Sequence, residues 1–154
     1  MPLERHVRLE WAWDIQADLN QMLFDVRIDD GATREVYVYR PDPTLVIKVE
    51  QESTFHNVRE HDIWFVVKGT KWAKWFAPVR NLSPLGRALL MARTRPWRNG
   101  DPMFPRRIPD VFVDVRRCNW GILNGRWVCH DYGYSRVLAH GIRDVALIKT
   151  VMED

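Results

Sequence analysis

The second half of the chain carries two aspartates and an asparagine at a spacing that suits phosphate chemistry. Four residues separate Asp114 from Asn119, and Asp131, Tyr132 and Gly133 begin twelve positions after the asparagine. A carboxylate can orient an attacking hydroxyl group, and an asparagine with a second carboxylate offers the oxygen ligands that Mg²⁺ prefers. The pattern therefore predicts a phosphoryl-transfer site in which Asp114 acts on the hydroxyl and Asn119 and Asp131 hold the metal.

The residues between Asn119 and Asp131 predict a tight hairpin. The dipeptide Asn124-Gly125 separates two short strand-like runs, and Asn-Gly in that position is the strongest short-range hairpin signal. A hairpin returns the chain beside its starting point, so we expect local folding to bring Asn119 and Asp131 close together. Because residues alternate between the two faces of a strand, both must lie beyond the strand ends if their side chains are to converge.

A lysine and a glutamate in the first half of the chain would complete the site. Lys48 lies in a strand-like run, and Glu60 lies in a helix expected from Ser53 to Lys68. Glu60 shares its helix face with apolar residues, and a carboxylate on a buried face needs a cation beside it. We therefore predict an ion pair between Glu60 and Lys48, on the preceding strand. Glu50 and Glu52 are less favoured partners for the lysine, because they fall at the strand-to-helix turn.

The order of these elements resembles that of the protein kinase-like fold. Val46-Ile47-Lys48-Val49 is similar to the Val-Ala-Ile-Lys strand of protein kinases, and a helix with a glutamate, an Asp-x₄-Asn segment and an Asp-aromatic-Gly segment follow it. The resemblance covers roughly residues 30 to 134. It implies an α+β protein in which an antiparallel sheet of about five strands plus one helix forms a kinase-like small lobe, with a much reduced large lobe.

This resemblance implies ATP and Mg²⁺ as ligands. Lys48 would neutralise nucleotide phosphates with Glu60 as its partner, and Arg116 stands where protein kinases carry a lysine that contacts the transferred phosphate. Met91, near the end of the fifth expected strand, would lie against the base, although a plain core strand is equally compatible with it. Gly31 is the only glycine where protein kinases carry three, so the loop that cradles the phosphates is poor, although Arg34 could assist in binding phosphate.

Other positions depart from the kinase pattern. Phe112 and Val113 precede Asp114 where the family usually carries His-Arg or His-Gly, and Tyr132 replaces the usual phenylalanine. Four prolines between residues 95 and 110 disfavour the helices that begin a kinase large lobe. The Ala-Pro-Glu element that closes a kinase activation segment is missing. An acceptor substrate therefore has no obvious platform within this chain.

We expect a single domain over residues 1–154. Residues 1–94 would form the small-lobe-like part, residues 95–110 a proline-rich linker, and residues 111–154 the catalytic loop, the metal hairpin and a terminal helix. Alternating apolar residues and turn signals place the strands at Leu23–Ile28, Glu35–Arg40, Leu45–Glu50, Trp75–Arg80 and Ala88–Thr94. Besides the helix from Ser53, which Ser or Thr would cap, helices are expected at residues 8–23 and Arg143–Met152.

The composition is that of an ordinary globular protein. Hydrophobic residues make up 46% of the chain and charged residues 28%, and no apolar run approaches the roughly 20 residues that a membrane span needs. The N-terminus lacks the apolar region of a signal peptide, so we expect a cytoplasmic protein with no membrane partner. A net charge of +3 without a recognised nucleic-acid module is thin support for a nucleic-acid ligand.

The leading hypothesis is a minimal kinase-like protein that binds ATP with Mg²⁺ and acts as a phosphotransferase on or with a protein partner. Competent side chains at Lys48, Glu60, Asp114, Asn119 and Asp131 favour this enzyme. The compactness suggests a phage or mobile-element factor with a host target. The alternative is a catalytically inactive kinase-like protein that binds or inhibits a partner, which the missing large lobe and the poor phosphate loop favour. A basic, tryptophan-rich nucleic-acid-binding protein is the third and least favoured hypothesis.

Overall fold

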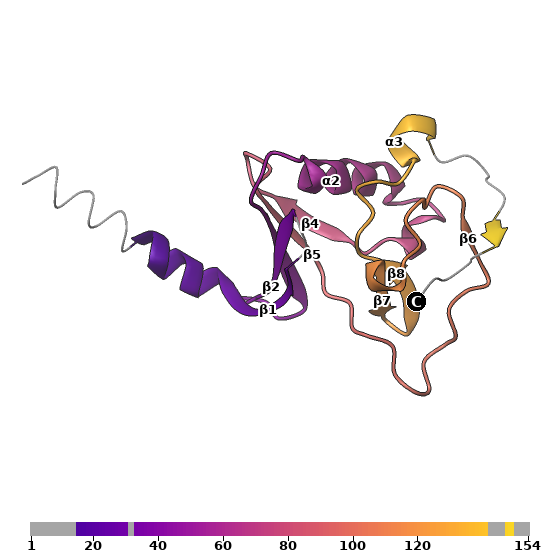
Figure 1. Cartoon of the computed structure of the whole chain (residues 1–154), viewed down its shortest axis with the longest axis horizontal. Coiled ribbons are helices and arrows are strands. Elements are labelled where there is room, and N and C mark those ends of the chain that lie inside the picture. The colour runs from indigo at the N-terminus through magenta and orange to yellow at the C-terminus, as the bar shows by residue number, and fades with distance from the viewer. Residues whose placement is uncertain (1–14, 31–32, 142–146, 150–154) are drawn as a thin grey trace, which may run out of the picture.

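The protein is built around a five-stranded antiparallel sheet (Figure 1). The structure, a computed structural model, describes residues 15–30, 33–141 and 147–149. In the order β1-β2-β3-β5-β4, the strands are β1 (Phe24–Asp30), β2 (Arg34–Tyr39), β3 (Leu45–Glu50), β5 (Ala88–Ala92) and β4 (Val79–Leu82). The expected α+β class with a five-stranded antiparallel sheet is confirmed, and β3 has the predicted bounds.

Helix α2 (His56–Val67) packs against β3, β4 and β5. The alternation of residues along the strands determines which side chains face it. Lys48 lies opposite Val36 of β2 and opposite Leu89 of β5, so these three residues share one face of the sheet. Leu89 is fully buried, which places Lys48 on the side of the sheet that faces the core.

The helix begins at His56, three residues after the predicted start at Ser53. Phe55, the residue before it, has a left-handed backbone (φ 59°) and no capping side chain. Glu50, at the end of β3, accepts hydrogen bonds from the His56 N–H at 2.5 Å and from the Thr54 hydroxyl at 2.7 Å. The predicted cap by Ser or Thr is therefore wrong. A carboxylate from the preceding strand takes that role, and a helix N-terminus favours negative charge.

The segment that follows α2 also differs from the prediction. Ala73–Trp75 form a short 3₁₀ helix, η1, where the predicted strand Trp75–Arg80 would begin. Pro78 has no N–H with which to join a sheet, and β4 begins directly after it, at Val79. The predicted start of this strand is therefore wrong, although its end overlaps the observed strand.

The predicted hairpin is present. Strands β7 (Trp120–Leu123) and β8 (Arg126–Cys129) pair antiparallel. Asn124 and Gly125 have φ values of 51° and 76°, and a two-residue turn of type I′ requires positive φ at both positions. The 3₁₀ helix η2 (Arg117–Asn119) leads into β7, so the hairpin starts directly after the predicted metal ligand Asn119.

The proline-rich linker contains no helix, as predicted. Arg95 and Asp101 form an ion pair of 2.6 Å across its first loop. Arg95 and Ile122 exchange two backbone hydrogen bonds, of 3.0 and 2.8 Å, and so fasten the linker to the hairpin. The short strand β6 (Arg107–Pro109) follows.

Aromatic residues join the hairpin region to the sheet through one core. The ring of Phe76 lies 4.8 Å from that of Phe112 and 5.1 Å from that of Tyr132, measured between centroids. The ring of Phe112 lies 4.9 Å from that of Trp120. Since Phe112 and Tyr132 are buried, they anchor the two segments that carry the predicted site residues.

Two predicted helices lie partly outside the described residues. Residues 15–23 are helical, and Figure 1 shows this helix standing away from the sheet; residues 8–14 are not described. The predicted helix Arg143–Met152 is wrong where it can be compared, because Leu147–Lys149 form a strand, β9, that pairs with β6. The available strand partner overrides the helical spacing of the apolar residues.

A short helix, α3 (Val137–His140), precedes this strand and packs against α2. In the part of the chain that the structure describes, no helix is long and apolar enough to cross a membrane.

Candidate functional site

Lys48 and Glu60 form a buried ion pair at the contact between β3 and α2. The Nζ of Lys48 lies 2.9 Å from Oε2 and 3.2 Å from Oε1 of Glu60, and the side chains are 4% and 0% exposed. The pair predicted from the sequence is therefore confirmed. Lys48 also donates a hydrogen bond to the backbone oxygen of His130, so all three N–H groups of its ammonium are engaged.

Arg34 is a second cation at this site; the sequence indicated it only as a residue that could assist the phosphate loop, not as a partner of Glu60. Its Nη1 and Nη2 donate to the two oxygens of Glu60 at 2.8 and 3.1 Å, and Nη2 also donates to Oδ1 of Asp131 at 2.8 Å. The alternation of Arg34 with Val36 and Val38 could have indicated this position, because alternate residues of a strand share one face. The face that carries the two valines is the one toward the core.

Two further groups complete the network. Asn57 of α2 accepts a hydrogen bond from Nη1 of Arg34 at 3.3 Å, and its Nδ2 donates to the backbone oxygen of Lys48 at 3.1 Å. The backbone N–H of Tyr132 donates to Oε1 of Glu60 at 3.1 Å. Strands β2 and β3, helix α2 and the segment after β8 therefore all meet at the Glu60 carboxylate.

Glu60 is ionised although it is fully buried. Burial alone would raise its pKa, but the charges of Lys48 and Arg34 act against this and lower the pKa of Glu60 to about 2. Burial also lowers the pKa of Arg34, and the Glu60 and Asp131 carboxylates outweigh that effect and hold it above its usual value. Two cations and two carboxylates thus form a charge-balanced network.

The two predicted metal ligands are neighbours along the hairpin. Asn119 ends η2 and Asp131 follows the end of β8, so both lie outside the regular strands, as the prediction required. The N–H of His130 donates to the backbone oxygen of Asn119 at 2.9 Å. Their side chains, however, have separate partners: Asp131 binds Arg34 at 2.8 Å, and Nδ2 of Asn119 donates to the backbone oxygen of Asp114 at 3.4 Å.

This donor set suits Mg²⁺ only as a companion of ligand phosphates. Within the described ranges, no three His, Cys, Asp or Glu side chains gather where they could hold a metal ion. Mg²⁺ commonly takes one or two carboxylates from a protein and completes its octahedron with phosphates and water. Asp131 and Asn119 would supply oxygens of this kind, and the Asp131 side chain is 43% exposed, so a ligand can reach it.

Asp114 and Arg116 are paired with each other. Nε and Nη2 of Arg116 donate to the two oxygens of Asp114 at 2.9 and 2.7 Å. The side chain of Arg116 is 68% exposed and that of Asp114 is 30% exposed. The hydrogen bonds from Arg116 lower the pKa of Asp114. The predicted catalytic carboxylate is therefore accessible and ionised, and both its oxygens already accept hydrogen bonds from Arg116.

The residue predicted to contact the nucleotide base, Met91, lies in the core. Met91 of β5 lies opposite Val46 of β3 and Val79 of β4, and it is fully buried in the core. It offers no surface to a base in this arrangement. Gly31 lies outside the described residues.

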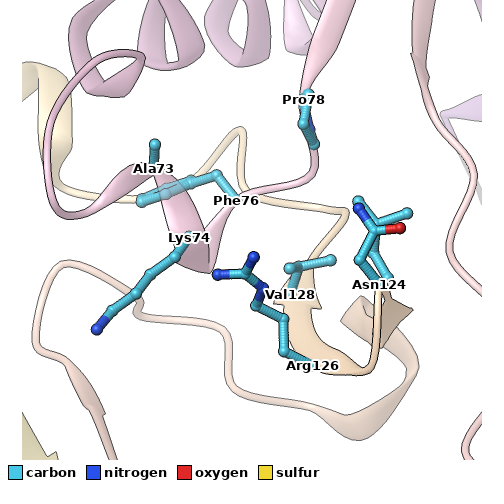
Figure 2. A pocket seen from close by; sticks show the side chains of 8 residues that line it. Ala73, Lys74, Phe76, Pro78, Asn124, Arg126 and Val128 are labelled. Atoms are coloured by element: carbon cyan, nitrogen blue, oxygen red, sulfur yellow. The ribbon is translucent and has the colours of Figure 1, made fainter.

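A separate pocket lies between η1 and the hairpin (Figure 2). Its volume is about 250 Å³, and Phe76 and Val128 contribute to its apolar lining. Lys74, Asn124 and Arg126 give the pocket its polar groups. None of the predicted site residues lines it, so this pocket is not part of the Lys48–Glu60 network.

No family model, no curated protein and no solved structure matches this chain. A functional assignment must therefore come from the geometry of the site.

Proposed function

We propose that the chain is a minimal kinase-like protein that binds ATP at the exposed edge of the Lys48–Glu60 network. The observation that carries this proposal is the buried Lys48–Glu60 ion pair, which Arg34 connects to the accessible carboxylate of Asp131. Replacing a buried ion pair with well-packed apolar residues is often neutral or stabilising. Stability alone is therefore a weak reason for these charges, and perturbed, buried ionisable groups beside an accessible one are typical of functional sites.

The order of the elements supports the kinase-like assignment. A strand with Lys48 precedes a helix with Glu60, and Asn119 and Asp131 flank a hairpin. In this proposal Lys48 and Arg34 supply positive charge near the phosphates. Asp131 and Asn119 would hold Mg²⁺, which would neutralise phosphate charge when bound.

Phosphoryl transfer would use Asp114. Its carboxylate, kept ionised by Arg116, would orient the hydroxyl group of the acceptor. The acceptor would be a partner protein, because the described residues after β5 do not form the helical large lobe with which a kinase holds its acceptor.

A catalytically inactive binding protein is the second candidate, and one observation favours it. The three N–H groups of Lys48 are engaged, and Asp131 and Asp114 are each paired with an arginine. A site whose groups satisfy one another in this way can serve as a rigid surface for a partner without any transfer of phosphate.

Nucleotide binding and transfer can be tested separately. Thermal unfolding with millimolar ATP, with and without Mg²⁺, should raise the melting temperature, because a ligand that binds only the native state stabilises it. Transfer of the γ-phosphate to the chain or to a copurified partner should fall about 10²–10⁴-fold in Asp114→Asn, with ATP affinity retained. Asp25→Asn, at an exposed aspartate paired with Arg40, is the control.

An unchanged melting temperature at every nucleotide concentration would overturn the proposal of an ATP site. ATP binding without any transfer in the unmodified protein would favour the binding protein over the enzyme.

A further inference from the structure

The terminal nitrogens of the two buried cations, Lys48 and Arg34, all donate hydrogen bonds to groups of the protein. Lys48 gives its three N–H groups to Glu60 and to the backbone of His130. The terminal nitrogens of Arg34 donate to Asn57, to both oxygens of Glu60 and to Asp131. An incoming phosphate that binds these terminal N–H groups must therefore take over one of these bonds.

Only one of these bonds ends on an exposed side chain. Glu60 and Asn57 are 0% exposed, whereas the Asp131 side chain is 43% exposed. Asp131 also makes a single hydrogen bond to Arg34, while Glu60 accepts two from it. The Asp131 carboxylate can therefore leave Arg34 without disturbing the buried part of the network, and Glu60 keeps the guanidinium in place.

We propose that Arg34 is the anion-receiving group of this site, and that the Asp131 carboxylate holds the position that a ligand phosphate takes. The ligand class is a polyphosphate, free or as part of a nucleotide. Guanidinium groups bind phosphate oxygens well because their N–H groups form a planar fork. This inference rests on the proposed nucleotide site. It adds that a polyphosphate binds there without a divalent metal, because Arg34 already supplies a cation next to Asp131.

Charge balance predicts an effect of Asp131→Asn that is opposite to the effect expected if Asp131 is only a metal ligand. Arg34 and Lys48 balance Glu60 and Asp131 in the free protein. Neutralising Asp131 makes the surroundings of Arg34 more positive by one charge and removes the internal competitor for Arg34. Asp131→Asn should therefore strengthen metal-free polyphosphate binding, whereas loss of a Mg²⁺ ligand would weaken nucleotide binding.

The experiment is calorimetric titration with sodium tripolyphosphate and with ATP, each in EDTA and each with Mg²⁺. In EDTA, Asp131→Asn should bind tripolyphosphate and ATP about tenfold more tightly than the unmodified protein, because one opposing charge is removed. Arg34→Gln should lose detectable binding in EDTA. Asp25→Asn and Arg40→Gln alter an exposed ion pair between β1 and the residue that follows β2, and both should bind as the unmodified protein does.

The outcomes separate this inference from the proposed function. ATP binding that requires Mg²⁺ and weakens in Asp131→Asn would overturn the inference and support the nucleotide site. Metal-free binding of tripolyphosphate but not of ATP would support Arg34 as an anion receiver and overturn the nucleotide site. Absence of binding by both ligands in all conditions would overturn both. If Arg34→Gln does not fold, the binding measured with Asp131→Asn decides between these outcomes, because the Asp131 side chain is exposed.

Discussion

The Glu60 carboxylate receives hydrogen bonds from Lys48, Arg34 and the backbone of Tyr132 while its side chain is fully buried. One donor alone would not offset the free energy of burying the ionised Glu60 carboxylate, because the desolvation of a buried carboxylate costs several kcal/mol. Removing one member of a buried ion pair costs about 3–5 kcal/mol, since the remaining charge is left uncompensated. The members of this network are therefore stable only together.

We expect Glu60 to stay ionised far below the pH at which carboxyl groups normally titrate. Its pKa of about 2, against the usual 4.5, means that the unfolded chain takes up the proton first as the pH falls. The resulting stabilisation of about 3 kcal/mol is complete above pH 4.5 and is lost as the pH falls from 4.5 to 2. Carboxyl-carbon NMR should show the Glu60 resonance titrating near pH 2, and the free energy of unfolding in urea should decline across this interval.

A Glu60 resonance that titrates near pH 4.5 would contradict the network. His130 contributes a separate loss of stability that begins at higher pH, because burial lowers its pKa from the usual 6.5. Below pH 4.5 the unfolding series also contains the loss from Asp101, whose pKa the hydrogen bonds from Arg95 lower to about 2, so the NMR titration is what identifies Glu60.

The sequence predicted the Lys48–Glu60 pair, whereas for Arg34 it indicated a possible part in phosphate binding but not the bonds to Glu60 and Asp131. The pair joins consecutive elements, so a buried carboxylate and the nearest strand lysine were enough to find it. Arg34 is separated by 26 residues from Glu60 and by 97 from Asp131. Only the pairing of β2 with β3 and the return of the chain after β8 bring these residues together.

The start of α2 depends on a side chain from another element. Glu50 accepts hydrogen bonds from the N–H groups of His56 and Asn57, at 2.5 and 3.4 Å, and from the hydroxyl of Thr54 at 2.7 Å. Loss of a helix cap costs about 0.5–2 kcal/mol, so Glu50→Ala should lower the free energy of unfolding by that amount. Hydrogen exchange should accelerate at the His56 and Asn57 amides.

Glu52→Ala is the matched control for this prediction, because Glu52 is exposed and lies two residues further along the same turn. Equal effects of the two substitutions on stability and on exchange would show that Glu50 does not cap α2.

Elements with strong local signals could be predicted, and elements set by distant contacts could not. The bounds of β3 and the turn at Asn124-Gly125 follow from alternation and from turn chemistry. The α2 cap comes from a residue six positions before the helix. The strand Leu147–Lys149 exists because β6 offers it a partner, whereas its own spacing of apolar residues favoured a helix.

The arrangement of the whole molecule depends on the contacts that hold the β7–β8 hairpin against the five-stranded sheet. The linker after β5 exchanges two backbone hydrogen bonds with β7, between Arg95 and Ile122. Thr94 also meets His130, with its Oγ1 2.8 Å from the Nδ1 of the histidine. Gly121 lies at this junction and lacks a side chain, which allows the two segments to approach closely. The position of Asp131 relative to Arg34 therefore depends on the contacts between the linker and the hairpin.

Gly121→Ala should weaken this junction, because a Cβ at residue 121 would lie 2.4 Å from Oγ1 and 2.7 Å from Cβ of Thr94, and 3.1 Å from the backbone oxygen of Arg95. Overpacking typically costs about 1–3 kcal/mol, and urea unfolding followed by tryptophan fluorescence should show a loss of this size. Thr94→Gly removes two of the three close contacts, so the double variant should lose less stability than the sum of the two single variants. Strictly additive losses would show that residues 94 and 121 do not meet, and that the hairpin is held to the sheet in another way.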